Sequence, residues 1–193
     1  TDDITYNRYV NSYDTNPDGG GLDLVGSPTV MTIADFTTAN AGTLKVLGDD
    51  YAFSQYDNAL GQWVRYPTAS PLGSFTTGQG YSMATNAGDG ATVAFTGAMQ
   101  TTTQNINIID NNDDNAGAGK RWTLVSHPFP SYINRNTAAD ATAFIGATTD
   151  VINDQYLAVY GWAGTHYVRK TLPDAQGAYI EAVRGCWGAG AHT

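Results

Sequence analysis

The sequence predicts an all-β fold, and its composition carries most of that prediction. Of the 18 acidic residues 17 are Asp, with Glu181 as the single Glu, and Lys occurs three times. The surfaces of helical proteins draw on Glu and Lys, whereas this chain is rich in Thr, Asn, Asp, Gly and Tyr, which are typical of strands and turns. Short alternating apolar stretches between Asn- and Gly-rich turns indicate antiparallel strands.

The charge and the cysteine count narrow the class of protein. The net charge is −9, and no basic stripe interrupts it, so we expect no nucleic-acid partner and no attraction to anionic membranes. No apolar run approaches the roughly 18 residues of a membrane-spanning helix, so we expect no membrane insertion. The single cysteine, Cys186, excludes an intrachain disulfide. The Lys-poor, Thr- and Tyr-rich composition favours an extracellular protein.

Two stretches near the start of each half of the chain resemble one another. The stretch "LDLVGSPTVMTI" (22–33) shares Leu, Val and Pro with "RWTLVSHPFPSYIN" (121–134) at an offset of 100. The following "TIAD" (32–35) recurs as "TAAD" (137–140) at an offset of 105. Thr followed three residues later by an acid resembles a capping box. Both copies are therefore predicted to begin a helical connector of about two turns.

Two further blocks repeat in the same order. The stretches 51–67 and 156–171 both read as hairpins, and Trp63-Val-Arg in the first matches Tyr167-Val-Arg in the second at an offset of 104. Tyr56 matches Tyr160 at the same offset. Finally "GQGYSM" (78–83) is echoed by "VRGCWG" (183–188), which aligns Gly80 with Gly185. A glycine before an apolar strand predicts a bulge or a close backbone approach.

These blocks predict two repeated antiparallel β-sandwich or jelly-roll-like units with short helical connectors. The first unit is expected over 1–109 and the second over 110–193, with the boundary in a run of Asp, Asn and Gly. We expect "ATVAFTGAM" (91–99) to pair beside "GQGYSM", and "QNINII" (104–109) to open the second unit as a strand. The second unit then lacks a counterpart of 91–99, which predicts an open sheet edge.

The segment from Trp122 to Asn134 resembles a known signature. Its pattern W-x-L-V-x-x-P-F-P-S-Y-I-N is similar to the "GWNLVGNPYPSxIDW" signature of secreted Bacteroidota proteins exported by the type IX pathway. The resemblance implies a β-rich region of an adhesin, a cell-surface protein or an extracellular enzyme, made as a longer precursor with an export signal and a C-terminal sorting domain. The chain departs from the pattern at His127, at Asn134 and Arg135, and in its tail.

The search for catalytic residues is negative. The sequence has no G-x-S-x-G elbow, "GAGK" at 117–120 is too short for a phosphate-binding loop, and the three histidines lack metal-ligand spacing. The polar pairs kept in both copies are Arg65 with Arg169 and Asp35 with Asp140, which we interpret as a strand-edge arginine and a helix cap. We therefore expect a protein that is not an enzyme.

Two clusters of Asp and Asn indicate calcium, the one cofactor that the sequence points to. In each, oxygen ligands alternate with other residues as in the first half of a calcium-binding loop. The twelfth position of the first loop is Val25 and not an acid, so the ligand set is incomplete, and the alternative is that these residues only form turns. The candidate ligands are Asp14, Asn16, Asp18, Asp110, Asn112 and Asp114.

Aromatic residues are the other candidate site. Those on the two hairpins could stack on a sugar ring or could pack as cross-strand pairs; they are Trp63, Tyr66, Trp162 and Tyr167. The N-terminal segment Ile4 to Tyr13 carries Ile4, Tyr6 and Tyr9 in alternation with polar residues. It could complete the open edge of a neighbouring copy, or it could fold back onto its own chain.

Together these features predict an extracellular structural or interaction protein. It would be a surface protein, an adhesin or a filament-forming subunit whose partners are copies of itself, joined head to tail by strand exchange, or other surface proteins. The alternative is a carbohydrate-binding accessory module of a secreted glycan-degrading enzyme, with glycans as partners.

Overall fold

The structure is a computed structural model, and it contains mostly antiparallel β-sheet with one short helix, as the sequence predicts. It describes residues 2–13, 21–86, 88–107 and 122–129, together with the backbone of 158–162, 167–171 and 186–190. The elements of the first half are β1 (Asp3–Val10), β2 (Asp23–Val25), β3 (Thr29–Val30), α1 (Ile33–Ala39), β4 (Val46–Leu47), β5 (Asp50–Asp57), β6 (Gln62–Pro67), β7 (Tyr81–Met83) and β8 (Ala91–Met99). Those of the second half are β9 (Trp122–Ser126), β10 (Ala158–Trp162), β11 (Tyr167–Thr171) and β12 (Cys186–Gly190).

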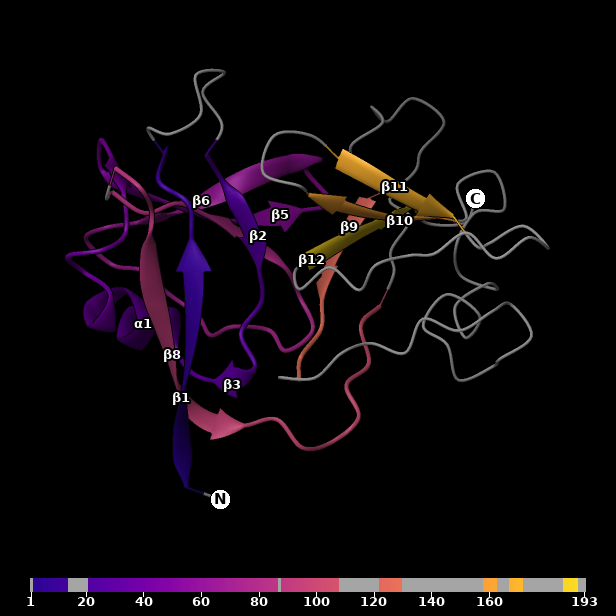
Figure 1. Cartoon of the computed structure of the whole chain (residues 1–193), viewed down its shortest axis with the longest axis horizontal. Coiled ribbons are helices and arrows are strands. Elements are labelled where there is room, and N and C mark those ends of the chain that lie inside the picture. Colours follow the sequence, from indigo (N-terminus) through magenta and orange to yellow (C-terminus); the bar gives the residue numbers. More distant parts are fainter. Residues whose placement is uncertain are drawn as a thin grey trace.

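The described strands form three sheets (Figure 1). The first sheet has three strands in the order β1-β8-β3, and the second has the order β2-β7-β5-β4 with β6 also paired to β5. The third has the order β11-β10-β12-β9 and lies to one side of the other two. Every pairing between these strands is antiparallel.

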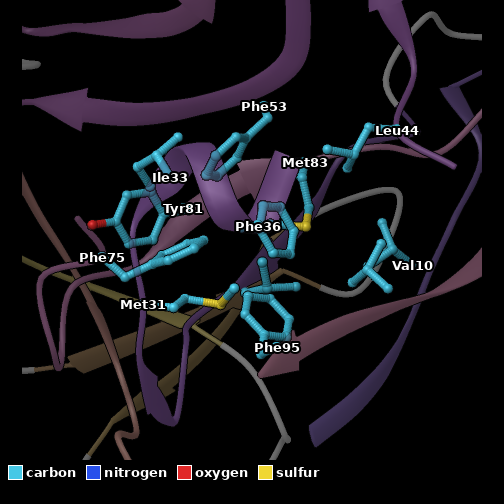
Figure 2. Packing of buried hydrophobic residues seen from close by; sticks show 12 residues of the cluster. Val10, Met31, Ile33, Phe36, Leu44, Phe53, Phe75, Tyr81, Met83 and Phe95 are labelled. Carbon is cyan, nitrogen blue, oxygen red and sulfur yellow. The ribbon is translucent and has the colours of Figure 1, made fainter. Parts of the chain in front are cut away.

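The first two sheets and α1 enclose one aromatic core (Figure 2). Phe36 of α1 lies at its centre, with its ring stacked on Phe95 at 4.8 Å between centroids and edge-on to Phe75 at 5.2 Å. Phe53 of β5 lies 5.4 Å from Phe36. Because β1 and β8 alternate between exposed and less exposed positions, one face of their sheet supplies Val10, Val93 and Phe95 to this core.

The first helical connector forms as predicted. Thr32 is the N-cap of α1: its hydroxyl accepts a hydrogen bond from the Asp35 backbone N at 3.0 Å and donates one to the Asp35 carboxylate at 2.6 Å. At seven residues α1 is too short to be stable alone, so its buried side chains, Ile33, Phe36 and Thr37, hold it against the sheets. The second predicted connector, from Thr137, lies outside the described residues.

The prediction for β8 was wrong in its partner. β8 does not pair beside β7 but pairs with β1 over eight residues, from Asp3 opposite Ala98 to Val10 opposite Ala91, and with β3 at its end. β7 has only three paired residues, and both of its edges are already occupied by β2 and β5. The long alternating strands β1 and β8 match one another instead.

The prediction of a strand over 104–109 was also wrong where the structure describes it, because residues 104–107 have no strand structure. The Gln104 side chain donates to the carbonyl of Thr102 at 2.9 Å and to the side chain of Gln100 at 3.1 Å. Such local side-chain bonds compete with strand pairing. Ile106 lies against Gly78, where a Cβ would come within 2.7 Å of Ile106 Cγ1.

Candidate interaction sites

The predicted N-terminal donor strand folds back onto its own chain, which was the alternative to strand exchange. Ile4 and Tyr6 are half-buried on the core-facing side of β1, and the Tyr6 ring lies 6.4 Å from that of Phe95. Tyr9 points to the other face, is 53% exposed, and donates through its hydroxyl to the carbonyl of Asp89. The three residues therefore do not form one patch.

The predicted hairpin aromatics of the first half also separate onto two faces. Tyr66 stacks on Phe53 at 4.6 Å between ring centroids and donates to the Gln55 side chain at 3.0 Å. Burial, with a smaller contribution from Tyr81, raises the pKa of Tyr66 far above its ordinary value. Trp63 lies three residues before Tyr66, on the opposite face. It is 40% exposed and meets the ring of its cross-strand partner edge-on, as packing aromatics do.

Trp162 and Tyr167 face each other in backbone register at the end of the second hairpin, and the structure describes their backbone alone. The corresponding pair in the first hairpin is Tyr56 with Trp63. Tyr and Trp are thus exchanged: the first strand of the hairpin carries Tyr56 in the first half and Trp162 in the second. The match of Tyr56 with Tyr160 that the sequence gives at an offset of 104 differs from this register, in which Tyr56 corresponds to Trp162.

The two sheets that contain these hairpins share one strand order. The order β2-β7-β5-β6 in the first half corresponds to β9-β12-β10-β11 in the second. The registers agree as well, because one row of directly paired residues crosses each sheet. In the first sheet the row is Val25, Tyr81, Gln55 and Val64, and in the second it is Val125, Trp187, Gly161 and Val168.

In this register Tyr81 of β7 corresponds to Trp187 of β12, which is an offset of 106. The sequence alignment of Gly80 with Gly185 is therefore one residue out of step with the register. A shift by one residue moves every side chain to the other face of a strand. The alignment of β2 with β9 at an offset of 100, and of β6 with β11 at 104, agrees with the register.

The two sheets are joined by a direct backbone contact that the sequence did not reveal. We call this the joint: residues 78–80, just before β7, and residues 124–126 of β9. The Gly80 backbone N donates to the Leu124 carbonyl at 3.0 Å, and the Ser126 backbone N donates to the Gly78 carbonyl at 2.6 Å. The Ser126 hydroxyl adds a bond to the Gln79 carbonyl at 2.9 Å. Gly80, where the sequence predicted a bulge or a close backbone approach, thus pairs with β9 through an ordinary backbone hydrogen bond.

Two glycines make the joint possible. Gly78 has a φ of 83°, in the left-handed region that favours glycine, and a Cβ there would press against Ile106. Gly26, which follows β2, has no room for a Cβ because the Ser126 side chain occupies that space. Ser126 and Val125 are buried. The signal in the sequence was the "GQG" triplet, but its distant partner could not be read from it.

The predicted calcium ligands, Asp14, Asn16, Asp18, Asp110, Asn112 and Asp114, lie outside the described residues. Among the residues that are described, no group of three His, Cys, Asp or Glu side chains is placed to hold a metal ion. In the same part of the chain, no helix is long and apolar enough to cross a membrane. No protein-family model, curated protein or solved structure matches the chain.

Proposed function

We propose that the chain is an extracellular structural or interaction protein, built from two copies of one β-unit and working by contact rather than by turnover. The observation that carries this proposal is the joint. Two sheets with the same strand order and register are connected by backbone hydrogen bonds between residues 78–80 of one and β9 of the next. Because backbone pairing needs no particular side chains, such a joint can link successive units into an extended body.

The proposed partners are copies of the same chain or other surface proteins. The edge of β2 that faces away from β7 corresponds, in strand order, to the edge of β9 that receives residues 78–80. A unit from another copy could therefore meet β2 as the first unit meets β9. Contacts of this head-to-tail kind need not close, and they generate filaments. The composition, poor in Lys and acidic overall, supports an extracellular location.

Negative-stain electron microscopy of the purified chain over a range of concentrations tests this proposal. We expect elongated assemblies whose length grows with concentration. A Gly26→Leu variant would displace the Ser126 side chain from the joint and should shorten them, whereas Gly42→Leu, at a glycine with open space around it, should not. Isolated particles of constant size at every concentration, for the unaltered chain, would contradict assembly.

A carbohydrate-binding module remains the second candidate, because Trp63 is 40% exposed and lies next to the exposed Arg65 on the same hairpin. A partly exposed indole ring beside a cation is a surface on which a sugar can stack. Titration of the chain with soluble polysaccharides, followed by tryptophan fluorescence, separates the candidates. Saturable quenching that is lost in Trp63→Ala and kept in Leu72→Ala would favour glycan binding over self-assembly.

A further inference from the structure

The strand β1 forms one border of its sheet. It pairs with β8 along all of its eight residues, and within the described part of the chain no strand pairs with its other edge. In Figure 1 its N-terminal end projects away from the third sheet. A long border strand is a template for another strand unless it is covered or blocked. The side chains of Asp3, Thr5 and Asn7 are exposed along it.

The hydrogen bonds of Asn40 reveal which backbone groups of β1 point outward. The Asn40 side chain, only 4% exposed, accepts from the Ala94 backbone N and donates to the Ala94 carbonyl, both at 2.9 Å. The backbone groups of Ala94 are therefore directed away from β1. Ala94 faces Asn7, and in an antiparallel pair both residues of such a position turn their groups away from each other. Asn7 thus presents its N–H and C=O to the outer edge.

The alternation of a strand extends this result to Thr5 and Asp3, whose backbone groups point the same way as those of Asn7. Asn11 provides an independent check. Asn11 lies an even number of residues after Asn7, so its backbone groups should point the same way. Its backbone N donates outward to the Asp23 carboxylate at 2.8 Å, and its carbonyl accepts from the Thr85 backbone N. Asp23 therefore caps this edge at Asn11, and in the part of the chain that the structure describes no strand pairs with the outward groups from Asp3 to Asn7.

We infer that this edge pairs with β1 of a second copy of the chain, antiparallel and about a two-fold axis at Thr5. Directly opposite residues in an antiparallel pair lie on the same face, so the register must set exposed residues against exposed ones. An axis at Thr5 does so: Thr5 faces Thr5 of the second copy, and Asp3 faces Asn7. All of these residues have outward backbone groups, so about six backbone hydrogen bonds form.

The side chains agree with this register. No acid faces an acid, because Asp3 lies opposite Asn7 of the second copy and Asp2 lies opposite its Arg8, which matters for two chains that each carry a net charge of −9. Thr5 already contacts Thr96 at 3.0 Å between their hydroxyl oxygens. The pairing would extend these hydroxyls into a row of four threonines across both copies.

The core-facing side agrees as well. Ile4 and Tyr6 are half-buried there, and the axis at Thr5 sets Ile4 against Tyr6 of the second copy, which is a favourable aliphatic–aromatic pair. An axis at Tyr6 would instead set Tyr6 against Tyr6 and Ile4 against Arg8. The proposed contact joins two three-stranded sheets into one of six strands. It uses a surface different from the joint, so it goes beyond the proposed function and does not depend on it.

Disulfide trapping tests both the contact and its register. In a Cys186→Ser background, Thr5→Cys should form a covalent dimer under mild oxidation, because hydrogen-bonded pairs have Cα atoms about 5.5 Å apart, within the range of a disulfide. Asn7→Cys, equally exposed on the same strand, lies opposite Asp3 of the second copy and should remain monomeric. Equal dimer yields from the two variants, or none from Thr5→Cys, would overturn the inference.

Proline substitution tests the backbone bonds in the otherwise unaltered chain. Thr5→Pro removes an outward N–H without breaking the ladder to β8, and proline is tolerated on such edges. At concentrations below those at which head-to-tail assemblies form, we expect sedimentation equilibrium to give a dimer for the unaltered chain and a monomer for Thr5→Pro, with nearly the same melting temperature. Tyr6→Pro removes an inward N–H and should lower the melting temperature. A monomeric unaltered chain, or a Thr5→Pro chain that still dimerises, would overturn the inference.

Discussion

The two sheets of matching order differ in what surrounds them. The sheet β2-β7-β5-β6 shares a core of twelve buried residues with α1 and with the sheet β1-β8-β3. The sheet β9-β12-β10-β11 meets the first half through the joint, and its described part has no second sheet of its own. Gln55 and Tyr81 in the first correspond to Gly161 and Trp187 in the second. A backbone register can thus be the same while the side chains on it differ.

The largest expected effect comes from removing the ring at the centre of the first core. Phe36 is fully buried between three other rings, so Phe36→Ala should lower the free energy of unfolding by about 3–5 kcal/mol. We expect hydrogen exchange to show lost protection in β8 and also in β9, whose outer partner is residues 78–80. Protection of the β10–β11 pairing should persist.

The control is Leu72→Ala, at a side chain that is 76% exposed, which should change the unfolding free energy by less than about 0.5 kcal/mol. Unchanged protection of β9 in Phe36→Ala would mean that the joint does not couple the two sheets. Equal loss of protection in all four strands of the second sheet would mean that the two sheets unfold as one body. Either result would change the degree of coupling assigned to the two sheets.

A smaller effect is expected at the edge of β8, a feature of the first half alone among the described residues. Asn40 bonds the backbone of Ala94 twice and donates to the Phe36 carbonyl at 2.8 Å. Asn40→Ala leaves the part-buried N–H and C=O of Ala94 without this partner, whereas the Phe36 carbonyl keeps its bond from the residue 40 backbone N, so the change should cost about 1–3 kcal/mol in chemical denaturation. Asn86→Ala removes an exposed bond to the Gly42 carbonyl and serves as control. A cost no larger than that of the control would contradict the role of Asn40.

How much of this could be predicted depended on the range of the interactions. The two hairpins and the cap of α1 are local, and the sequence predicted both. The partner of β8 is β1, a strand distant in the sequence, and local patterns do not identify it. The strand prediction failed over 104–107 because the Gln104 side chain bonds its own neighbours. The joint connects Gly78 with Ser126, and a glycine pattern alone does not name so distant a partner. Calcium binding by the candidate Asp and Asn ligands remains a prediction.

Substitutions at two glycines with similar positive φ angles measure how much the joint contributes to stability. Gly78 and Gly73 have φ of 83° and 91°, so alanine at either position costs about 1–2 kcal/mol of strain. At Gly73 an added Cβ meets nothing within 4 Å, whereas at Gly78 it presses against Ile106. We therefore expect Gly78→Ala to be the more destabilising of the two in thermal unfolding. It should also speed hydrogen exchange at Ser126, and Gly73→Ala should not.

A still smaller loss of stability, confined to high pH, is expected from the first hairpin and not from the second. Tyr66 corresponds to Lys170 in the register of the second hairpin, and burial raises the pKa of Tyr66. Above the ordinary tyrosine pKa of about 10 the unfolded chain loses this proton while the folded chain keeps it, so stability falls as pH rises. We expect Tyr66→Phe to lose less stability than the unaltered chain between pH 9 and 11, measured by urea unfolding. Parallel curves would contradict the assigned cause.

The smallest expected effect comes from exchanging the aromatic pair at the end of the first hairpin. Tyr56 faces Trp63 with 5.3 Å between ring centroids, and the second hairpin has Trp162 facing Tyr167. The double variant Tyr56→Trp with Trp63→Tyr gives the first hairpin the order of the second. If both pairs serve packing, the exchange should change the unfolding free energy by less than about 0.5 kcal/mol, whereas Trp63→Ala should cost about 1 kcal/mol. A double variant as unstable as Trp63→Ala would mean that the two hairpin ends, despite their shared register, pack their rings in different ways.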